Sequence, residues 1–106
     1  MDLAEIGYWS RKEFGRDAAS RYVSLIRQAI RDVARDPERP GSKQLEELRG
    51  EGFRAYHLAF SRPRITGRTV KSPRHFLVYR YADPKRIEVV RILHDSRDLV
   101  RHVPLD

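Results

Sequence analysis

A chain of 106 residues, 40% of them hydrophobic, has room for one domain with a small core, which we expect to span residues 1–106. The absence of cysteine excludes disulfides, thiolate metal sites and a cysteine nucleophile. With no long apolar run and no signal-peptide pattern, the chain is expected to be soluble, cytoplasmic and free of membrane contact. The net charge of +7 and the 35% of charged residues predict an ionic surface with a basic excess.

Residues 2–14 and 16–36 have the periodicity of two helices. In the second segment, apolar side chains follow the 3-4 pattern of one buried stripe, and arginines occupy the other face. Asp36-Pro37 ends it, because a residue before proline is pushed out of the helical region. A short joint at Gly15 predicts that the two helices form an antiparallel hairpin. The apolar positions are Leu3, Ile6 and Trp9 in the first helix and Ala19, Tyr22, Val23, Ile26, Ile30, Val33 and Ala34 in the second.

The second half of the chain has the pattern of three strands, at residues 53–62, 75–82 and 86–94. The first strand alternates, with Tyr56, Leu58 and Phe60 on one face and His57, Ala59 and Ser61 on the other. The other two are apolar on both faces, which is typical of strands buried in a sheet. The turn at residues 83–85 joins them into an antiparallel hairpin.

This order of elements predicts an α+β fold, in which an N-terminal antiparallel helical hairpin packs on a small antiparallel β-sheet. A three-stranded sheet with an apolar face needs such a cover to be stable. Residues 37–52 are interpreted as a loop. Residues 63–73 are also interpreted as a loop, with Thr66-Gly67 suited to the tip of a small extra ribbon, and residues 98–103 are predicted to form one helical turn.

The sequence lacks the motifs that hold a nucleotide, a metal or a serine nucleophile. It contains no P-loop, no GxGxxG and no HExxH. The four histidines are not spaced as ligands on a predicted helix and have no close carboxylate company that indicates a metal. We therefore expect no cofactor and no metal. The histidines are His57, His75, His94 and His102.

The basic excess lies entirely in the second half of the chain. Residues 1–52 hold ten basic and ten acidic side chains, whereas residues 53–106 hold twelve basic and five acidic ones. Such a region attracts polyanions or an acidic protein partner. The alternative is that the basic excess has no binding role and reflects only the composition of the genome. Eighteen of the 22 basic residues are arginine, as a GC-rich genome would produce. Between residues 53 and 82 there is no acidic residue, and the seven basic ones are Arg54, Arg62, Arg64, Arg68, Lys71, Arg74 and Arg80.

One group of basic residues stands at the ends of predicted strands. Arg74-His75 opens the second strand, Arg91 and His94 close the third, and Arg54 opens the first. In an antiparallel sheet of this size these side chains could lie within reach of one another. Arginine and histidine together can bind a phosphate and act as general acid and base on an RNA 2′-hydroxyl without a metal. The alternative is structural, with Arg91 in an ion pair and His94 packed at the strand end.

Four segments follow one another in an order that points to a known family. They are Asp2-Leu3 with Ile6, Tyr8 and Phe14-Gly15; Ala18, Tyr22, Leu25 and Ile30 with Ala34-Arg35-Asp36-Pro37; residues 73–80 (PRHFLVYR); and residues 87–98 (IEVVRILHDSRD). In this order and spacing they resemble the two helices and the last two strands of ParE toxins, which belong to the RelE/ParE toxin superfamily. The similarity covers almost the whole chain.

The resemblance implies the toxin of a type II toxin–antitoxin (ParDE) system, which acts in growth arrest and plasmid maintenance. A cognate ParD-like antitoxin would neutralise it through a disordered arm that folds on binding. ParE members inhibit DNA gyrase, whereas the RelE branch cuts mRNA on the ribosome. Operator DNA would be contacted only through the antitoxin complex. The family usually begins with a short strand before the Asp-Leu pair; only Met1 precedes it here, so we expect that strand to be missing.

The residues favour the ParE branch of the superfamily. RNA-cutting relatives tend to carry a tyrosine near the end of the last strand, where this chain has His94-Asp95. We therefore expect a non-enzymatic gyrase inhibitor with no catalytic residues. The alternative is a RelE-like ribosome-dependent mRNA endoribonuclease that uses Arg74, Arg91 and His94. A plain DNA-binding module ranks last, because no recognition helix is evident. The residues expected to contact gyrase or the antitoxin are Arg54, Arg64, Arg68, Lys71, Arg74, Arg97 and Arg101.

Overall fold

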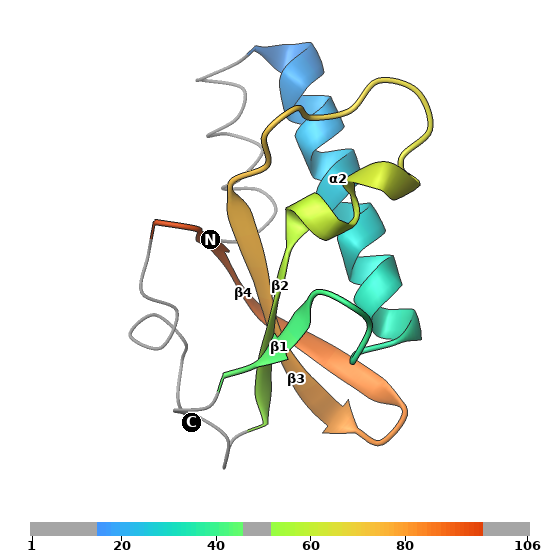
Figure 1. Ribbon diagram of the computed structural model, residues 1–106, viewed down its shortest axis with the longest axis vertical. Helices are drawn as coiled ribbons and strands as arrows, with labels where there is room; N and C mark the ends of the chain where they lie inside the picture. Colours follow the sequence, from blue (N-terminus) through green and yellow to red (C-terminus); the bar gives the residue numbers. More distant parts are fainter. Residues whose placement is uncertain (1–14, 46–51, 97–106) are drawn as a thin grey trace.

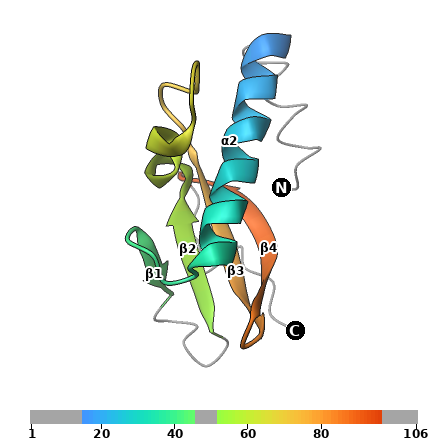
Figure 2. The ribbon, with the colours of Figure 1, turned by 90° about the vertical axis from the view of Figure 1, so that its right-hand side faces the viewer.

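The computed structural model describes residues 15–45 and 52–96, shown in Figures 1 and 2. The four strands form one antiparallel sheet in the order β1-β2-β3-β4, with α2 across one face. This confirms the predicted α+β class. The predicted first helix and the turn at residues 98–103 lie outside the described residues, and so does the start of the chain, where the family's usual first strand is expected to be missing. In chain order the elements are α2 (Arg16–Arg35), β1 (Ser42–Gln44), β2 (Phe53–His57), the 3-10 turns η2 (Leu58–Phe60) and η3 (Arg62–Arg64), β3 (His75–Asp83) and β4 (Arg86–His94).

Helix α2 follows the prediction closely at both ends. It begins after Gly15, whose φ of +91° is a conformation that glycine adopts without strain. It ends at Arg35, and Asp36 before Pro37 is already extended. No helix within residues 15–45 and 52–96 has the length and apolar character needed to cross a membrane.

The main core lies between α2 and one face of the sheet. Buried apolar side chains of the helix pack against side chains that alternate along β2, β3 and β4. In β3, Leu77 and Tyr79 belong to this core, whereas Phe76 and Val78 lie on the opposite face. Each fully buried side chain of this size contributes about 1.5–3 kcal/mol through removal from water. The core members are Tyr22, Leu25, Ile26, Ala29, Val33, Tyr56, Leu58, Leu77, Tyr79 and Ile92.

The sheet is also buried on its second face. Leu45, Phe53, Ala55, Val78 and Leu93 form a separate apolar cluster there, and each is at most 6% exposed. The prediction that the last two strands are apolar on both faces agrees with this arrangement.

The interpretation of residues 37–52 as loop is wrong at one point, because Ser42–Gln44 forms the edge strand β1. It pairs with β2 in the register Ser42↔Tyr56 to Gln44↔Arg54. Three polar residues offer no hydrophobic alternation, so the sequence gives no sign of a strand. A short, polar edge strand also protects the sheet from pairing with other chains.

The first predicted strand ends earlier than expected, at His57 instead of residue 62. His57 Nδ1 accepts a hydrogen bond from the backbone N–H of Ala59 at 3.1 Å, which starts the turn η2. Leu58 stays in the core, but Phe60 is 53% exposed and Ser61 is fully buried, so the predicted alternation fails beyond the turn. The apolar residues of this turn are spaced by chance as in a strand, so the sequence pattern predicted a strand that continues past His57.

Residues 65–74 contain no strand, so the predicted ribbon at Thr66-Gly67 is wrong. Ile65 and Val70 instead pack against the main core as partly buried side chains. Packing against the core shared by α2 and the sheet, rather than pairing with each other, holds these two side chains.

The segment between α2 and β1 contains a tight turn whose residues match a type II β-turn. Ser42 N donates to Arg39 O at 2.9 Å, with Pro40 at the second position and Gly41 at the third. Gly41 has a φ of +98°, and a Cβ atom there would lie 2.6–2.8 Å from ring carbons of Phe60. The turn therefore requires glycine for two separate reasons.

Gly41→Ala should lower the free energy of unfolding by about 1–2 kcal/mol, because alanine is strained at this φ and its Cβ displaces Phe60. Thermal or urea unfolding measures the change. Adding Phe60→Ala should recover the steric part of the loss and leave the backbone part. An unchanged stability of Gly41→Ala would refute the assigned backbone requirement.

Candidate functional site

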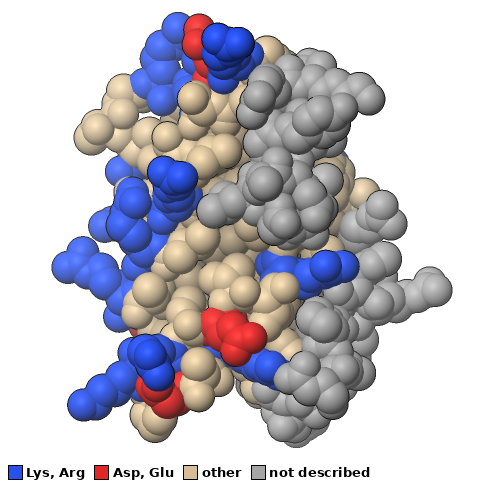
Figure 3. Space-filling view, turned by 180° about the vertical axis from the view of Figure 1, so that it is seen from behind, with Lys and Arg blue, Asp and Glu red and all other residues tan. Residues whose placement is uncertain are grey.

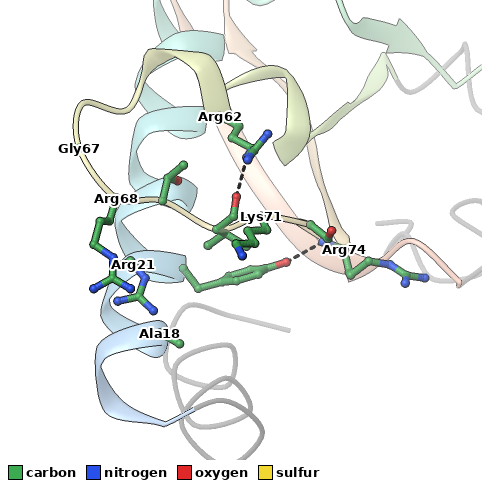
Figure 4. A pocket seen from close by; sticks show the side chains of 11 residues that line it. Ala18, Arg21, Arg62, Gly67, Arg68, Lys71 and Arg74 are labelled. Carbon is green, nitrogen blue, oxygen red and sulfur yellow. Dashed lines mark hydrogen bonds between the residues drawn. The ribbon is translucent and has the colours of Figure 1, made fainter.

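A pocket of about 750 Å³ lies between the first half of α2 and the segment that precedes β3 (Figure 4). Five of its lining residues are basic, and no lining residue that the structure describes is acidic. Its remaining lining residues are small or apolar, with Ala18, Tyr22 and Val70 among them. The basic residues are Arg21, Arg62, Arg68, Lys71 and Arg74.

The helical repeat explains the α2 side of this pocket. Ala18, Arg21 and Tyr22 stand at i, i+3 and i+4, so they share one face of the helix. Tyr22 is only 3% exposed and points toward the core, whereas Arg21 is half-buried at the edge of the same face.

Two hydrogen bonds hold the opposite wall of the pocket in place. Arg62 Nε donates to the backbone carbonyl of Val70 at 2.6 Å. The backbone N–H of Arg74 donates to Tyr22 Oη at 2.9 Å, which joins the end of the segment to α2. These contacts fix an irregular segment across the helix without any strand pairing.

Beside the pocket, at one end of the sheet, three histidines meet an aspartate. His57 ends β2, His75 begins β3 and His94 ends β4, and antiparallel pairing places these three positions together. Asp95 Oδ2 lies 3.2 Å from His57 Nε2, and Asp95 Oδ1 lies 3.6 Å from His94 Nδ1. The rings of His75 and His94 are 5.2 Å apart in an edge-on arrangement.

Asp95 is held as a carboxylate by its neighbours. Arg74 donates to it through Nε at 3.1 Å and through a terminal nitrogen at 3.0 Å. This hydrogen bond, together with those from His57 and the positive charges nearby, lowers the pKa of Asp95 against the opposing effect of burial. The same contact raises the pKa of Arg74. The guanidinium of Arg74 is therefore occupied and points out of the pocket in Figure 4.

His75 is the buried member of the histidine group. Burial, followed by the neighbouring His94, lowers the pKa of His75 to about 4. Its Nδ1 lies 2.6 Å from Tyr22 Oη. Burial raises the pKa of Tyr22 to about 12, so the hydroxyl is protonated. Tyr22 Oη also accepts from Arg74 N, and its own proton can be donated to Nδ1 of the neutral imidazole.

The structure brings together only part of the predicted cluster of strand-end residues. Arg74, His75 and His94 lie at the same end of the sheet. Arg91 pairs with Val78 on the second face, whereas His94 pairs with His75 on the face toward α2. Arg54 pairs with Tyr79 near the opposite end. The expectation that Arg54 and Arg91 join this cluster is wrong, because β2 runs antiparallel to β3 and a spacing of three in a strand reverses the face.

Two of the residues predicted to contact a partner are engaged inside the protein. Arg54 Nε donates to Ser42 Oγ at 2.8 Å, which links β2 to the edge strand. Arg64 Nε donates to the buried carboxylate of Asp32 at 2.8 Å. Arg68, Lys71 and Arg74 line the pocket. Arg97 and Arg101 lie outside the described residues.

The sequence reasoning did not select several residues of these sites. Arg62 lies in the basic segment, and Arg21 lies on the arginine face of α2, but only the fold of residues 65–74 places them around one pocket. His57 and Asp95 have no recognisable motif. A sequence signal existed for one feature only, since antiparallel pairing of the last two predicted strands sets His75 opposite His94.

Basic side chains also cover much of the surface along α2. Seen from behind in Figure 3, lysine and arginine atoms gather along the left edge, the side on which α2 lies. Exposed arginines of the helix are Arg16, Arg27, Arg31 and Arg35. Within residues 15–45 and 52–96, no three histidine, aspartate or glutamate side chains converge as a metal site requires.

The described part of the chain is thus a small α+β domain in which basic side chains of α2 and of the loops before β3 line one pocket. The family model for the ParE toxin of the type II toxin–antitoxin system parDE matches residues 1–99 of the chain. The chain therefore belongs to the ParE toxin family, whose members work with an antitoxin. A comparison with curated proteins finds no match to it.

Proposed function

We propose that this toxin arrests growth by binding DNA gyrase and that a ParD-like antitoxin neutralises it in the cytoplasm. The observation that carries the proposal is the cationic pocket, whose described lining contains five basic side chains and no acidic one. A protein that inhibits by binding needs such a surface and needs no catalytic set. Long-range attraction to an acidic surface also speeds the encounter of the two proteins.

The same surface suits an antitoxin with an acidic, disordered arm. Such an arm folds on binding and follows a surface of complementary charge. Operator DNA would then be contacted through the antitoxin rather than by this chain. Arg68 and Lys71 are the side chains most suited to partner contact, because both are exposed and neither forms an ion pair within the described residues.

The ribonuclease alternative receives less support from the geometry. Residues that bind and cleave at one phosphate must lie on the same face of the sheet, and Arg91 lies on the face opposite to His94. Arg74 already forms an ion pair with Asp95 at 3.0 Å. These contacts favour a structural role for the cluster that includes Arg74 and His94.

A supercoiling assay with purified gyrase tests the proposal. The toxin should block supercoiling, and Arg68→Ala with Lys71→Ala should weaken the block by roughly tenfold or more, as expected for the loss of two charged contacts. Arg86→Ala is the control, because its side chain is 79% exposed at the start of β4, where it pairs with Asp83 beside the β3–β4 turn. Normal supercoiling at an excess of folded toxin would overturn the proposal. Ribosome-dependent mRNA cleavage that His94→Ala abolishes would establish the alternative.

A further inference from the structure

Three of the five cations around the pocket are not committed to internal contacts. Arg62 donates to Val70 O and Arg74 forms an ion pair with Asp95. In contrast, Arg21, Arg68 and Lys71 have no ion pair within the part of the chain that the structure describes. They come from two different segments, α2 and residues 65–74. Figure 4 shows Arg21 and Arg68 toward one side of the pocket and Arg74 at the other, with Lys71 between.

The pocket combines this cationic rim with an apolar wall. Ala18 and Val70 line it together with Tyr22, whose hydroxyl is already hydrogen bonded to Arg74 N and His75. Its volume of about 750 Å³ falls within the range of small-molecule sites. A ligand that fills it needs a concentrated negative charge and a compact body with a flat face that packs on apolar surface.

A phosphorylated nucleoside has both properties. Its phosphate carries up to two charges and presents several oxygens, which suits two guanidinium groups and an ammonium group that line the same pocket. Its base is a flat ring system that packs on apolar surface. A single carboxylate carries only one charge and two acceptor oxygens, so a phosphate uses the three uncommitted cations more fully.

We propose that this pocket binds one nucleotide unit, with the phosphate held by Arg21, Arg68 and Lys71 and the base against Ala18 and Val70. The unit is either a free nucleotide or one residue of a single-stranded nucleic acid, since the recognised chemistry is the same. This binding does not depend on gyrase, so it stands or falls separately from the proposed function.

Titration of the purified full chain with thymidine 5′-monophosphate, thymidine and a single-stranded dT8 oligonucleotide tests the proposal. We expect binding of the monophosphate at one site and at least tenfold weaker binding of thymidine. A dT8 affinity far above that of the monophosphate identifies a strand as the source of the unit, and equal affinities identify the free nucleotide. Hexaglutamate serves as the acidic-peptide probe.

Matched variants locate the binding. Ala18→Glu adds a negative charge to the pocket, and Ala18→Gln adds the same bulk without charge, so the glutamate variant should bind the monophosphate at least tenfold more weakly than the glutamine variant. Arg21→Ala with Lys71→Ala should also lose at least tenfold in affinity. Arg27→Ala removes an exposed arginine of α2 that does not line the pocket, and it should leave affinity unchanged.

Three results would overturn the proposal. They are the absence of monophosphate binding by the folded toxin, equal binding by the Ala18→Glu and Ala18→Gln variants, and displacement by hexaglutamate of a ligand that no nucleotide displaces. The last result would assign the pocket to an acidic peptide. Gyrase inhibition without nucleotide binding would reject this inference alone.

Discussion

Replacing Asp32 by alanine should lower the free energy of unfolding by about 3 kcal/mol at neutral pH, the loss typical of breaking a buried charged network. Asp32 lies on α2 and is 1% exposed. Its carboxylate accepts hydrogen bonds from Ser61 Oγ at 2.6 Å and from Arg64 Nε at 2.8 Å. Arg39 lies 3.6 Å away. These contacts tie η2 and η3 to the helix.

The charge of Asp32 is stabilised by its neighbours. Burial alone would raise the pKa of Asp32, but hydrogen bonds from Ser61 and Gln28 and the charges of Arg64 and Arg39 outweigh burial and lower it. The contribution of Asp32 to stability is therefore complete above the unfolded pKa of about 3.9 and is lost as the pH falls through the lower pKa of the folded state. Alanine also leaves the Ser61 hydroxyl without its buried acceptor.

Urea unfolding at pH 7 measures this loss, with Asp36→Ala as the matched control. Asp36 is exposed just after α2, and its carboxylate accepts a single weak hydrogen bond of 3.3 Å from Glu38 N. The control should change stability by less than about 0.5 kcal/mol, as surface substitutions usually do. Equal effects of the two substitutions would show that the Asp32 network does not stabilise the fold.

The toxin should lose on the order of 3 kcal/mol of stability between pH 6.5 and pH 4 through His75 alone. The pKa of His75 is lowered to about 4 in the fold, mainly by burial, against about 6.5 in an unfolded chain. The unfolded state therefore binds a proton in this range that the folded state does not. Stability from this residue is complete above pH 6.5 and declines as the pH falls toward 4.

The surroundings of His75 explain why protonation is unfavourable. Tyr22 Oη lies 2.6 Å from Nδ1, and where the hydroxyl donates to that nitrogen, a proton added there would have to displace this hydrogen bond. His94 and His57 oppose a positive charge on the ring, and Asp95 favours one less strongly than burial and His94 together oppose it.

His75→Asn removes the titrating group and keeps an acceptor for Tyr22. Its stability at pH 8 should be lower, because the smaller side chain leaves a cavity. Its stability should change much less than that of the parent between pH 6.5 and 4. His57→Gln, at a partly buried position, should keep most of the parent's decline because His75 remains. A His75→Asn profile parallel to the parent would rule out His75 as the source of the acid sensitivity.

Local chemistry accounts for the elements that the sequence predicted. The 3-4 spacing of buried residues from Ala19 to Val33 determines α2, since only a helix places them on one face. Asp36-Pro37 ends it for a steric reason that acts within two residues. The double-faced apolar strands and the turn at residues 83–85 determine the β3–β4 hairpin, in which Lys85 N donates to Asp83 Oδ1 at 2.8 Å.

The sequence failed where a distant contact determines the conformation. β1 is a strand only because β2 provides its hydrogen-bonding partners. β2 gives way to η2 near the point where Ser61 reaches the buried carboxylate of Asp32, 29 residues earlier in the chain. Propensity over a few residues cannot contain information about a partner so far away.

The same distinction between local sequence and distant contacts applies to the candidate site. The excess of basic residues in the second half of the chain and the family resemblance follow from the order of residues, and Arg68, Lys71 and Arg74 were selected on that ground. Which cations face a common pocket and which serve the interior depends on packing. Arg64 is directed to Asp32, and Arg21 joins the pocket because residues 65–74 cross α2. The sequence by itself determined the charge, the helix and the hairpin, because each depends on neighbouring residues; only the tertiary structure decided the pocket and the histidine group, because both are assembled from segments far apart in the chain.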